Sequence, residues 1–162
     1  MKFDRLVLSL LVLVSSAGHC QEKLPATAES QPQSLTAAEQ KFASLLTNAQ
    51  LTGYFTTWDE PEAPQKDTYT LEKIAKLNGD LWMFVARIQY GEHDTRVLLP
   101  LPVRWAGDTP VIMLDKFPVP GFGIFSARIV IHDDQYAGTW NGGDHGGHMY
   151  GRIVKLDNQA KD

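Results

Sequence analysis

The sequence predicts an all-β fold, an antiparallel up-and-down meander of about eight strands that closes into a small barrel after one N-terminal amphipathic helix. Apolar and polar residues alternate along three successive segments, as they do on strands with one buried face. The connectors between segments are short and rich in Gly, Asn, Asp and Pro, the residues that turns require. Closure into a barrel removes exposed sheet edges. A two-sheet β-sandwich is the alternative.

The expected strands are marked by runs of β-branched, aromatic and alternating residues. They lie near residues 50–57, 68–77, 81–90, 95–104, 111–115, 122–132, 135–141 and 147–156. In the third segment, Trp82, Phe84, Ala86, Ile88 and Tyr90 share one face. In the fourth, Val97, Leu99, Leu101, Val103 and Trp105 do so, and in the sixth Phe125, Ala127, Ile129 and Ile131. This period of two indicates strands with one face in a core.

Two features refine this prediction. Asn78-Gly79 predicts a type I′ hairpin turn, in which both central residues have positive φ. Pro100 and Pro102 lack backbone donors at alternate positions of the fourth strand. One side of that strand is therefore expected to be a sheet edge or a bulge.

The helix is expected to begin after Thr36. Thr36 and Glu39 have the spacing of a capping box, in which each side chain bonds the other residue's backbone N–H. The apolar residues that follow at helical spacing are Ala38, Phe42, Leu45 and Leu46. This narrow stripe predicts a helix that packs on the sheet, in preference to one that binds a membrane or a partner.

The N-terminus is typical of an export signal. Lys2 and Arg5 precede the apolar run 6–14, which is shorter than the ~20 residues of a membrane span. The predicted organisation is a signal peptide at 1–20, a disordered leader at 21–35, one barrel domain with its helix at 36–157, and a tail at 158–162. The protein is then secreted or periplasmic, with no integral membrane span after signal removal; an uncleaved anchor is the alternative.

Cys20 is the only cysteine, so no intrachain disulfide can form. It stands where a lipoprotein carries its acylated cysteine, but His19 occupies the position at which that motif has a small residue. The sequence therefore argues against a lipid anchor at Cys20.

The formal net charge is −4, and it becomes more negative once residues 1–20 are removed. A negative chain disfavours nucleic acid as a partner.

Several segments resemble a family of small secreted bacterial proteins known only as hypothetical. They are Leu51-Thr52-Gly53, Gly79-Asp80-Leu81-Trp82, 105–112, and 136–140 with 146–149. The resemblance covers about residues 36–156 and implies an exported single domain, without any activity. A looser architectural similarity links the chain to calycins, the lipocalin and avidin-like barrels. Their Gly-x-Trp lies on the first strand, whereas Gly138-Thr139-Trp140 lies on the penultimate one.

The densest group of chemically active side chains lies in the last hairpin. His145 and His148 have His-x-x-His spacing beside Asp144, and His132 or Asp133 could add a ligand from a neighbouring turn. Imidazole and carboxylate groups bind zinc. The alternative, which the sequence favours, is a glycine-rich loop whose polar side chains only cap turns.

The aromatic residues Trp82, Trp105, Trp140 and Tyr90 could line a barrel mouth and bind a small apolar ligand. Packing in the core is the alternative.

The sequence has no Gly-x-Ser-x-Gly nucleophile elbow and no phosphate-binding loop before a helix. It therefore favours a non-enzymatic binding or scaffold module for an unknown small molecule or protein partner. A zinc-dependent enzyme or metal-binding protein at Asp144, His145 and His148 is the alternative function.

Overall fold

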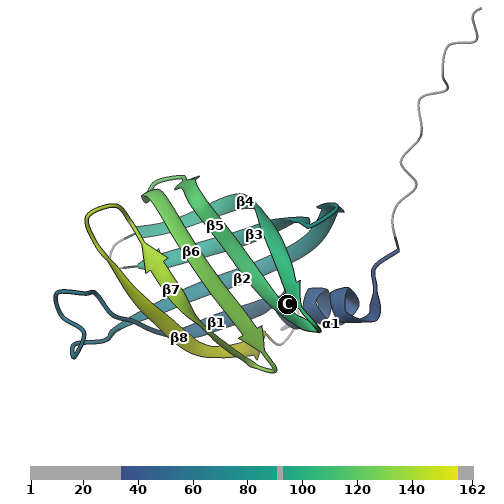
Figure 1. Ribbon diagram of the computed structural model, residues 1–162, viewed down its shortest axis with the longest axis horizontal. Helices are drawn as coiled ribbons and strands as arrows, with labels where there is room; N and C mark the ends of the chain where they lie inside the picture. Colours follow the sequence, from purple (N-terminus) through teal and green to yellow (C-terminus); the bar gives the residue numbers. More distant parts are fainter. Residues whose placement is uncertain (1–33, 91–92, 157–162) are drawn as a thin grey trace, which may run out of the picture. The chain divides into compact units, whose positions relative to one another are not determined.

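The computed structural model describes residues 34–90 and 93–156. The expected signal peptide, Cys20 and most of the leader lie outside this range, as does the tail. One helix is followed by eight strands (Figure 1): α1 Ala37–Leu46, β1 Ala49–Phe55, β2 Gln65–Asn78, β3 Leu81–Tyr90, β4 His93–Ala106, β5 Thr109–Val119, β6 Gly123–His132, β7 Gln135–Asn141 and β8 Gly146–Lys155.

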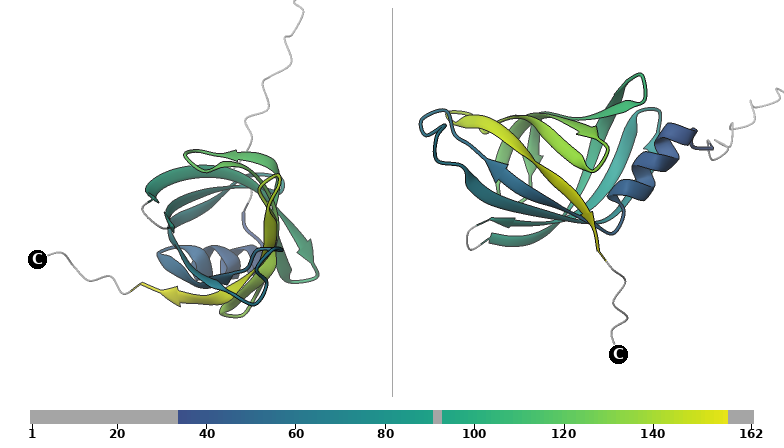
Figure 2. Two further views of the ribbon diagram at one scale, coloured as in Figure 1. Left: turned by 90° about the vertical axis from the view of Figure 1, so that its left-hand side faces the viewer. Right: turned by 90° about the horizontal axis from the view of Figure 1, so that it is seen from below.

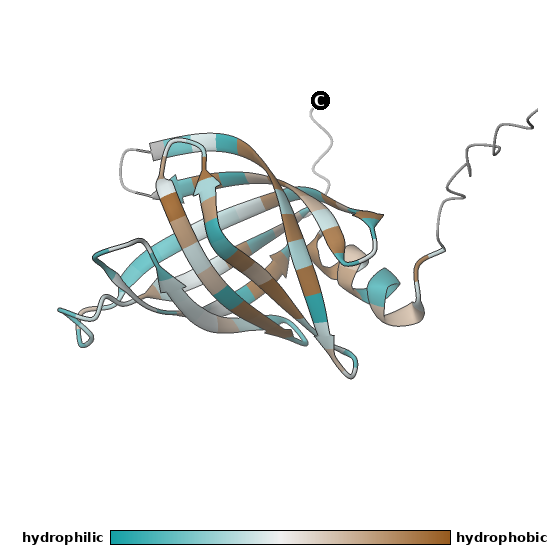
Figure 3. Cartoon of the chain, turned by 45° about the horizontal axis from the view of Figure 1, so that its top comes forward, coloured by the Kyte–Doolittle hydropathy of each residue, from teal (hydrophilic) through white to brown (hydrophobic). Residues whose placement is uncertain are grey.

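The eight strands form one closed antiparallel barrel in chain order. Each strand pairs with its neighbours in sequence, and β1 closes the ring by pairing with β8 from Ala49 opposite Lys155 to Phe55 opposite Met149. The predicted up-and-down barrel is therefore confirmed, and the sandwich is excluded. Figure 3 shows the alternation of apolar and polar residues along the strands that predicted it.

Helix α1 covers one end of the barrel (Figure 2). The predicted capping box is present: the Glu39 N–H donates to Thr36 Oγ1 at 3.2 Å, and the Thr36 N–H donates to Glu39 Oε2 at 2.9 Å. Phe42 and Leu46 carry the buried face of the helix. The antiparallel order brings the β2–β3, β4–β5 and β6–β7 turns to this end, which we call the helix end, and the other connections to the opposite, open end.

The three turns at the helix end are tight. Their loops are Gly79-Asp80, Gly107-Asp108 and Asp133-Asp134, and in each only the first residue has positive φ, at 50°, 67° and 50°. Positive φ at the first central residue alone is the requirement of a type II′ turn. The type I′ prediction for Asn78-Gly79 is therefore wrong, because Asn78 is still paired with Leu81 and the loop is shifted by one residue.

Strand β4 has the expected partial edge. Its residues 93–102 pair with the whole length of β3, from His93 opposite Tyr90 to Pro102 opposite Leu81. Its ladder with β5 covers only Val103–Ala106, opposite Thr109–Ile112. Pro100 and Pro102 lie just before this short ladder, where a missing N–H removes no bond to β5.

Candidate functional site

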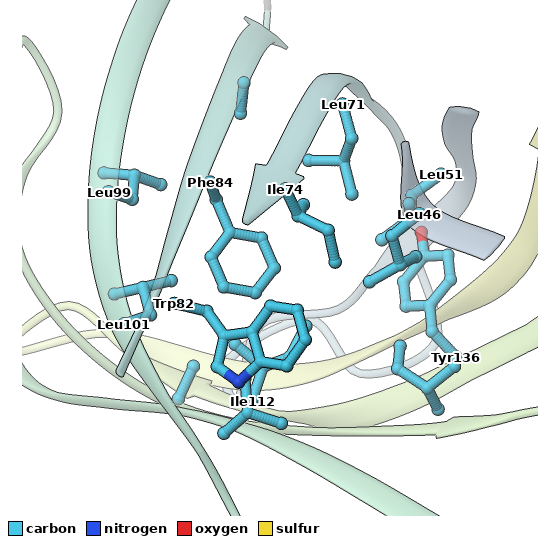
Figure 4. Packing of buried hydrophobic residues seen from close by; sticks show 14 of the residues in the cluster. Leu46, Leu51, Leu71, Ile74, Trp82, Phe84, Leu99, Leu101, Ile112 and Tyr136 are labelled. Atoms are coloured by element: carbon cyan, nitrogen blue, oxygen red, sulfur yellow. The ribbon is translucent and has the colours of Figure 1, made fainter. Parts of the chain in front are cut away.

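The two halves of the barrel interior are packed differently. In the half next to α1, most inward-facing side chains are almost fully buried, although Trp105 is only partly buried. Trp82 and Val103 are 0% exposed, and Phe42 from the helix lies 5.2 Å from the Trp82 ring, edge to face. Figure 4 shows Trp82 and Phe84 within this cluster, with Leu101 and Ile112 nearby. The interior of the helix end is therefore a closely packed core.

Several inward-facing side chains of the open half keep part of their surface accessible, although Val119 and Met149 there are only 7% and 6% exposed. The partly buried apolar residues that face inward from the middle of the barrel to the open end are Phe55, Tyr69, Ile88, Phe117, Phe125 and Trp140. Apolar side chains inside a barrel lose contact with water unless the space beside them is incompletely filled. The open half is therefore the candidate functional site.

Aromatic rings gather at the open end. The Trp140 ring centroid lies 5.8 Å from that of Phe55, 6.3 Å from that of Phe125 and 5.5 Å from that of His145. Trp140 Nε1 donates a hydrogen bond of 3.2 Å to the Thr56 carbonyl, which fixes the orientation of the indole. We call Phe55, Phe125, Trp140 and His145 the aromatic rim.

The glycines of the last hairpin have a structural explanation. The chain after β1 continues along β8, with the Thr56 N–H donating to His148 O at 2.9 Å and the Trp58 N–H donating to Gly146 O at 2.8 Å. A Cβ added at Gly147 would overlap the Thr56 carbonyl, and one at Gly146 would lie 2.8 Å from the Trp58 ring. Gly146 and Gly147 therefore permit the close approach of this segment to the rim.

A polar group lies deeper, on the inner face of β2. Asp67 is 4% exposed. Its Oδ1 accepts a hydrogen bond of 3.3 Å from the Tyr136 hydroxyl, and its Oδ2 is buried without a partner among the described residues. Burial raises the pKa of Asp67, and hydrogen bonds from Tyr69 and Tyr136 oppose part of that rise.

Two glycines allow Tyr136 to reach Asp67. In register, Asp67 lies opposite Gly53, Gly53 opposite Gly151, and Gly151 opposite Tyr136. A Cβ at Gly53 would lie 2.5 Å from Tyr136 Oη, and a Cβ at Gly151 would lie 2.7 Å from Tyr136 Cε1. The ring thus crosses two strands over positions that have no side chain.

The interior cluster, as we call Asp67, Tyr69 and Tyr136, has a defined chemistry. Burial, together with the adjacent Asp67 carboxylate, raises the pKa of both tyrosines, so both keep their protons and act as donors at neutral pH. None of the ion pairs among the described residues involves Asp67. The cluster can therefore accept a hydrogen bond or a positive charge at Oδ2.

The aromatic residues expected at a barrel mouth are divided between the two ends. Trp82 and Trp105 lie at the helix end, where both rings pack against Phe42 at 5.2 and 5.7 Å. Trp140 belongs to the rim, and Tyr90 is the last residue of β3 at the open end. Of the three tryptophans expected at the mouth, the structure thus brings only Trp140 to the candidate site.

The residues expected to bind zinc are not gathered in one place. His132 ends β6 at the helix end, whereas Asp144 and His145 lie in the β7–β8 connection at the open end. His148 is exposed on the outer face of β8, because Gly147 and Met149 are the buried neighbours in its strand. No group of three or more His, Cys, Asp or Glu that could hold a metal ion occurs within 34–90 and 93–156.

Asp144 and His145 instead form a local pair. His145 Nδ1 lies 2.7 Å from Asp144 Oδ1, and this hydrogen bond lowers the pKa of the fully exposed Asp144 carboxyl. A solvent-exposed pair of this kind contributes little to stability. Its place beside Trp140 makes it a polar border of the rim.

The interior cluster was not found by sequence reasoning. The signal was present: Asp67 is in phase with Tyr69 and Leu71, so a carboxylate occupies an inward position of β2. The strand expected from the sequence begins at residue 68, so Asp67 was placed outside it and its inward position was not recognised. Nothing local in the sequence indicates that Tyr136, 69 positions away, would reach it.

The outer surface offers one further feature. Tyr54 of β1 and Tyr150 of β8 are exposed, with ring centroids 6.1 Å apart, and Val154 is exposed further along β8. If the partner is a protein, the other possibility expected from the sequence, this exposed stripe is the surface that it would contact.

Comparison with protein-family models, curated proteins and solved structures found no significant match for this chain. The resemblances to hypothetical secreted proteins and to calycins therefore stay expectations. Within the described residues, no helix is long and apolar enough to cross a membrane.

Proposed function

We propose that this protein is a non-enzymatic binding module that takes a small, largely apolar molecule into the open half of its barrel. The observation that carries the proposal is the contrast in packing. Inward-facing Phe55, Ile88 and Trp140 stay partly exposed, while Trp82 and Val103 in the other half are sealed. An eight-stranded barrel is the size at which an interior is either filled or holds one small ligand.

The side chains of the open half favour an apolar ligand. Aromatic and aliphatic groups line it, and one compact polar group lies further in, which is the usual composition of a small-molecule site. The rim rings are oriented by contacts to one another and by the bond from Trp140 to Thr56. A ligand would therefore meet surfaces that are already ordered, which reduces the entropy cost of binding.

The test is binding of the neutral fluorescent probe N-phenyl-1-naphthylamine to the folded protein. We expect saturable binding with about one site per chain, and an affinity about tenfold weaker in Trp140→Ala and in Phe125→Ala, since loss of an aromatic contact costs ~1.4 kcal/mol. The matched control is Leu98→Ala, an apolar side chain 56% exposed on the outer face of β4, which should bind as the wild type does.

Two results would refute the proposal. One is absence of saturable binding by folded wild-type protein. The other is binding that both rim variants leave unchanged while Leu98→Ala reduces it, because the probe would then sit on the outer surface. Thermal unfolding of each variant, followed by circular dichroism, shows that the comparison is made on folded protein.

Export is part of this proposal. The signal peptide expected at residues 1–20 would deliver the module to the periplasm or beyond, where it would meet ligands outside the cytoplasm. Intact mass of the protein recovered from the cell envelope and medium tests this point. A chain that begins near residue 21 supports export, and a full-length chain confined to the cytoplasm contradicts it.

A further inference from the structure

The unpartnered oxygen of Asp67 indicates what kind of ligand the barrel takes. Buried polar atoms in folded proteins nearly always have a hydrogen-bond partner, and each exception calls for an explanation. Asp67 is 4% exposed and its Oδ2 has no partner among the described residues. A carboxylate left in this state reduces stability, so its presence inside the barrel suggests a role that requires it.

Both oxygens of the other buried carboxylate, that of Glu39, have hydrogen-bond partners. Glu39 Oε1 accepts from Lys76 Nζ at 2.6 Å, and Glu39 Oε2 accepts from the Thr36 N–H at 2.9 Å. Asp67 has no equivalent of Lys76. Its partners are the neutral hydroxyls of Tyr69 and Tyr136, and no described side chain offers a cationic donor to Oδ2.

The surroundings of Asp67 select among possible partners. A metal ion requires several ligands, and the described residues gather no such group. An anion would be repelled by the carboxylate. An ammonium group carries three donors and a positive charge, so it could bond Oδ2 and also meet the hydroxyl oxygens of Tyr69 and Tyr136.

The interior cluster is also connected to the rim. Asp67 lies opposite Gly53 in β1, and Phe55 is the next inward position of β1 toward the open end, about 7 Å along the strand. The Phe55 ring in turn contacts Trp140. A ligand with one polar end at Asp67 would therefore extend its apolar part past Phe55 toward Trp140.

We propose that Asp67, together with Tyr69 and Tyr136, binds the protonated amine of a small amphipathic molecule whose apolar part lies against Phe55 and Trp140. The inference rests on the proposed function and specifies its ligand class. It predicts that the barrel distinguishes molecules of one length by their polar end, with the amine preferred over the alcohol and the alcohol preferred over the carboxylate.

The experiment is displacement of N-phenyl-1-naphthylamine at pH 7 by n-octylamine, n-octanol and octanoate. For the wild type we expect octylamine to compete at least about tenfold more strongly than octanol, the size of effect that a charge-assisted hydrogen bond provides. Asp67→Asn should remove this preference and leave displacement by octanol unchanged. Asp59→Asn, which removes an exposed carboxylate from the β1–β2 connection near the rim, should retain it.

The outcomes separate the two proposals. Equal competition by the three compounds, with saturable probe binding intact, overturns the amine site and leaves the proposed binding function standing. Failure of the probe to bind refutes the binding function itself. Loss of the amine preference in Asp59→Asn as well as in Asp67→Asn assigns the effect to surface charge and also overturns the inference. If Asp67→Asn does not fold, the relative competition of octylamine, octanol and octanoate for the wild type tests the amine site by itself.

Discussion

At the helix end of the barrel, both oxygens of the buried Glu39 carboxylate have partners, whereas in the open half one oxygen of Asp67 has none. The tryptophan side chains of the two halves also differ, in how far they are buried. Trp82 is sealed beneath Phe42, while Trp140 stays partly exposed at the rim. The helix end therefore has the packing of a stable core, whereas the open half is incompletely packed and paired, as the proposed binding function requires.

The two carboxylates also respond to pH with opposite sign. Burial raises the pKa of Glu39, but the hydrogen bonds from Lys76 and Thr36 outweigh it and leave the pKa lowered. The stability from Glu39 is present above the ordinary carboxyl pKa and is lost as pH falls through its lowered value. For Asp67, whose pKa is raised, stability is present at acidic pH and is lost as pH rises through that raised value.

The largest effect is expected from Gly53→Ala. The added methyl group would overlap the Tyr150 carbonyl and lie 2.5 Å from Tyr136 Oη, so strands or the tyrosine must move. We expect the free energy of unfolding to fall by about 3 kcal/mol or more, measured by denaturant titration. The control is Gly79→Ala in a helix-end turn, where φ is +50° and no atom lies within 4 Å of the new methyl group. It should cost only about 1 kcal/mol. Equal losses would show that the interior above Gly53 is loosely packed.

The second effect concerns the helix end. Glu39→Ala removes the capping interaction and leaves the Lys76 ammonium, whose side chain is 15% exposed, without its partner. We expect a loss of about 3 kcal/mol in unfolding free energy. Lys41→Ala is the control, because Lys41 and Asp133 form an exposed pair at 3.9 Å that should contribute less than about 0.5 kcal/mol. A small loss in Glu39→Ala would mean that α1 is held by its apolar face alone.

A third, smaller effect tests the open half. Asp67→Asn removes the buried charge, so we expect the free energy of unfolding at pH 7 to rise by about 1 kcal/mol. The gain should shrink as pH is lowered through the window between the raised pKa of Asp67 and the ordinary carboxyl value, because the wild-type carboxyl is then neutral as well. Denaturant titrations of both proteins from pH 3 to pH 8 measure this difference in the free energy of unfolding. A gain that is constant across this range would show that charge is not the cause.

The smallest effect is expected at a helix-end turn. Asp133 has φ of 50°, a conformation that glycine adopts with less strain. Asp133→Gly should therefore stabilise the protein by about 0.5 kcal/mol, measured by thermal and denaturant unfolding. Destabilisation would show that the contacts of Asp133 with Lys41 and His132 contribute more than their exposure suggests.

Much of the fold could be predicted because its signals are local. The alternation from Trp82 to Ile88 sets the face of β3, and the Thr36 and Glu39 spacing sets the start of α1. Turn geometry was less predictable, since Gly79 is the first loop residue and not the second, and this choice depends on the register between β2 and β3. The expected zinc ligands show a related limit: His132 and His145 lie in successive turn regions, which an up-and-down barrel places at opposite ends.

The sequence by itself determined the number and order of the strands, the buried faces of β3, β4 and β6 and the start of the helix, because those properties depend on neighbours a few residues apart. Only the tertiary structure decided that Tyr136 crosses Gly151 and Gly53 to reach Asp67, and that Glu39 is paired while Asp67 is not. These contacts join residues 37 and 69 positions apart. Their geometry follows from strand register and barrel closure, which no local pattern specifies.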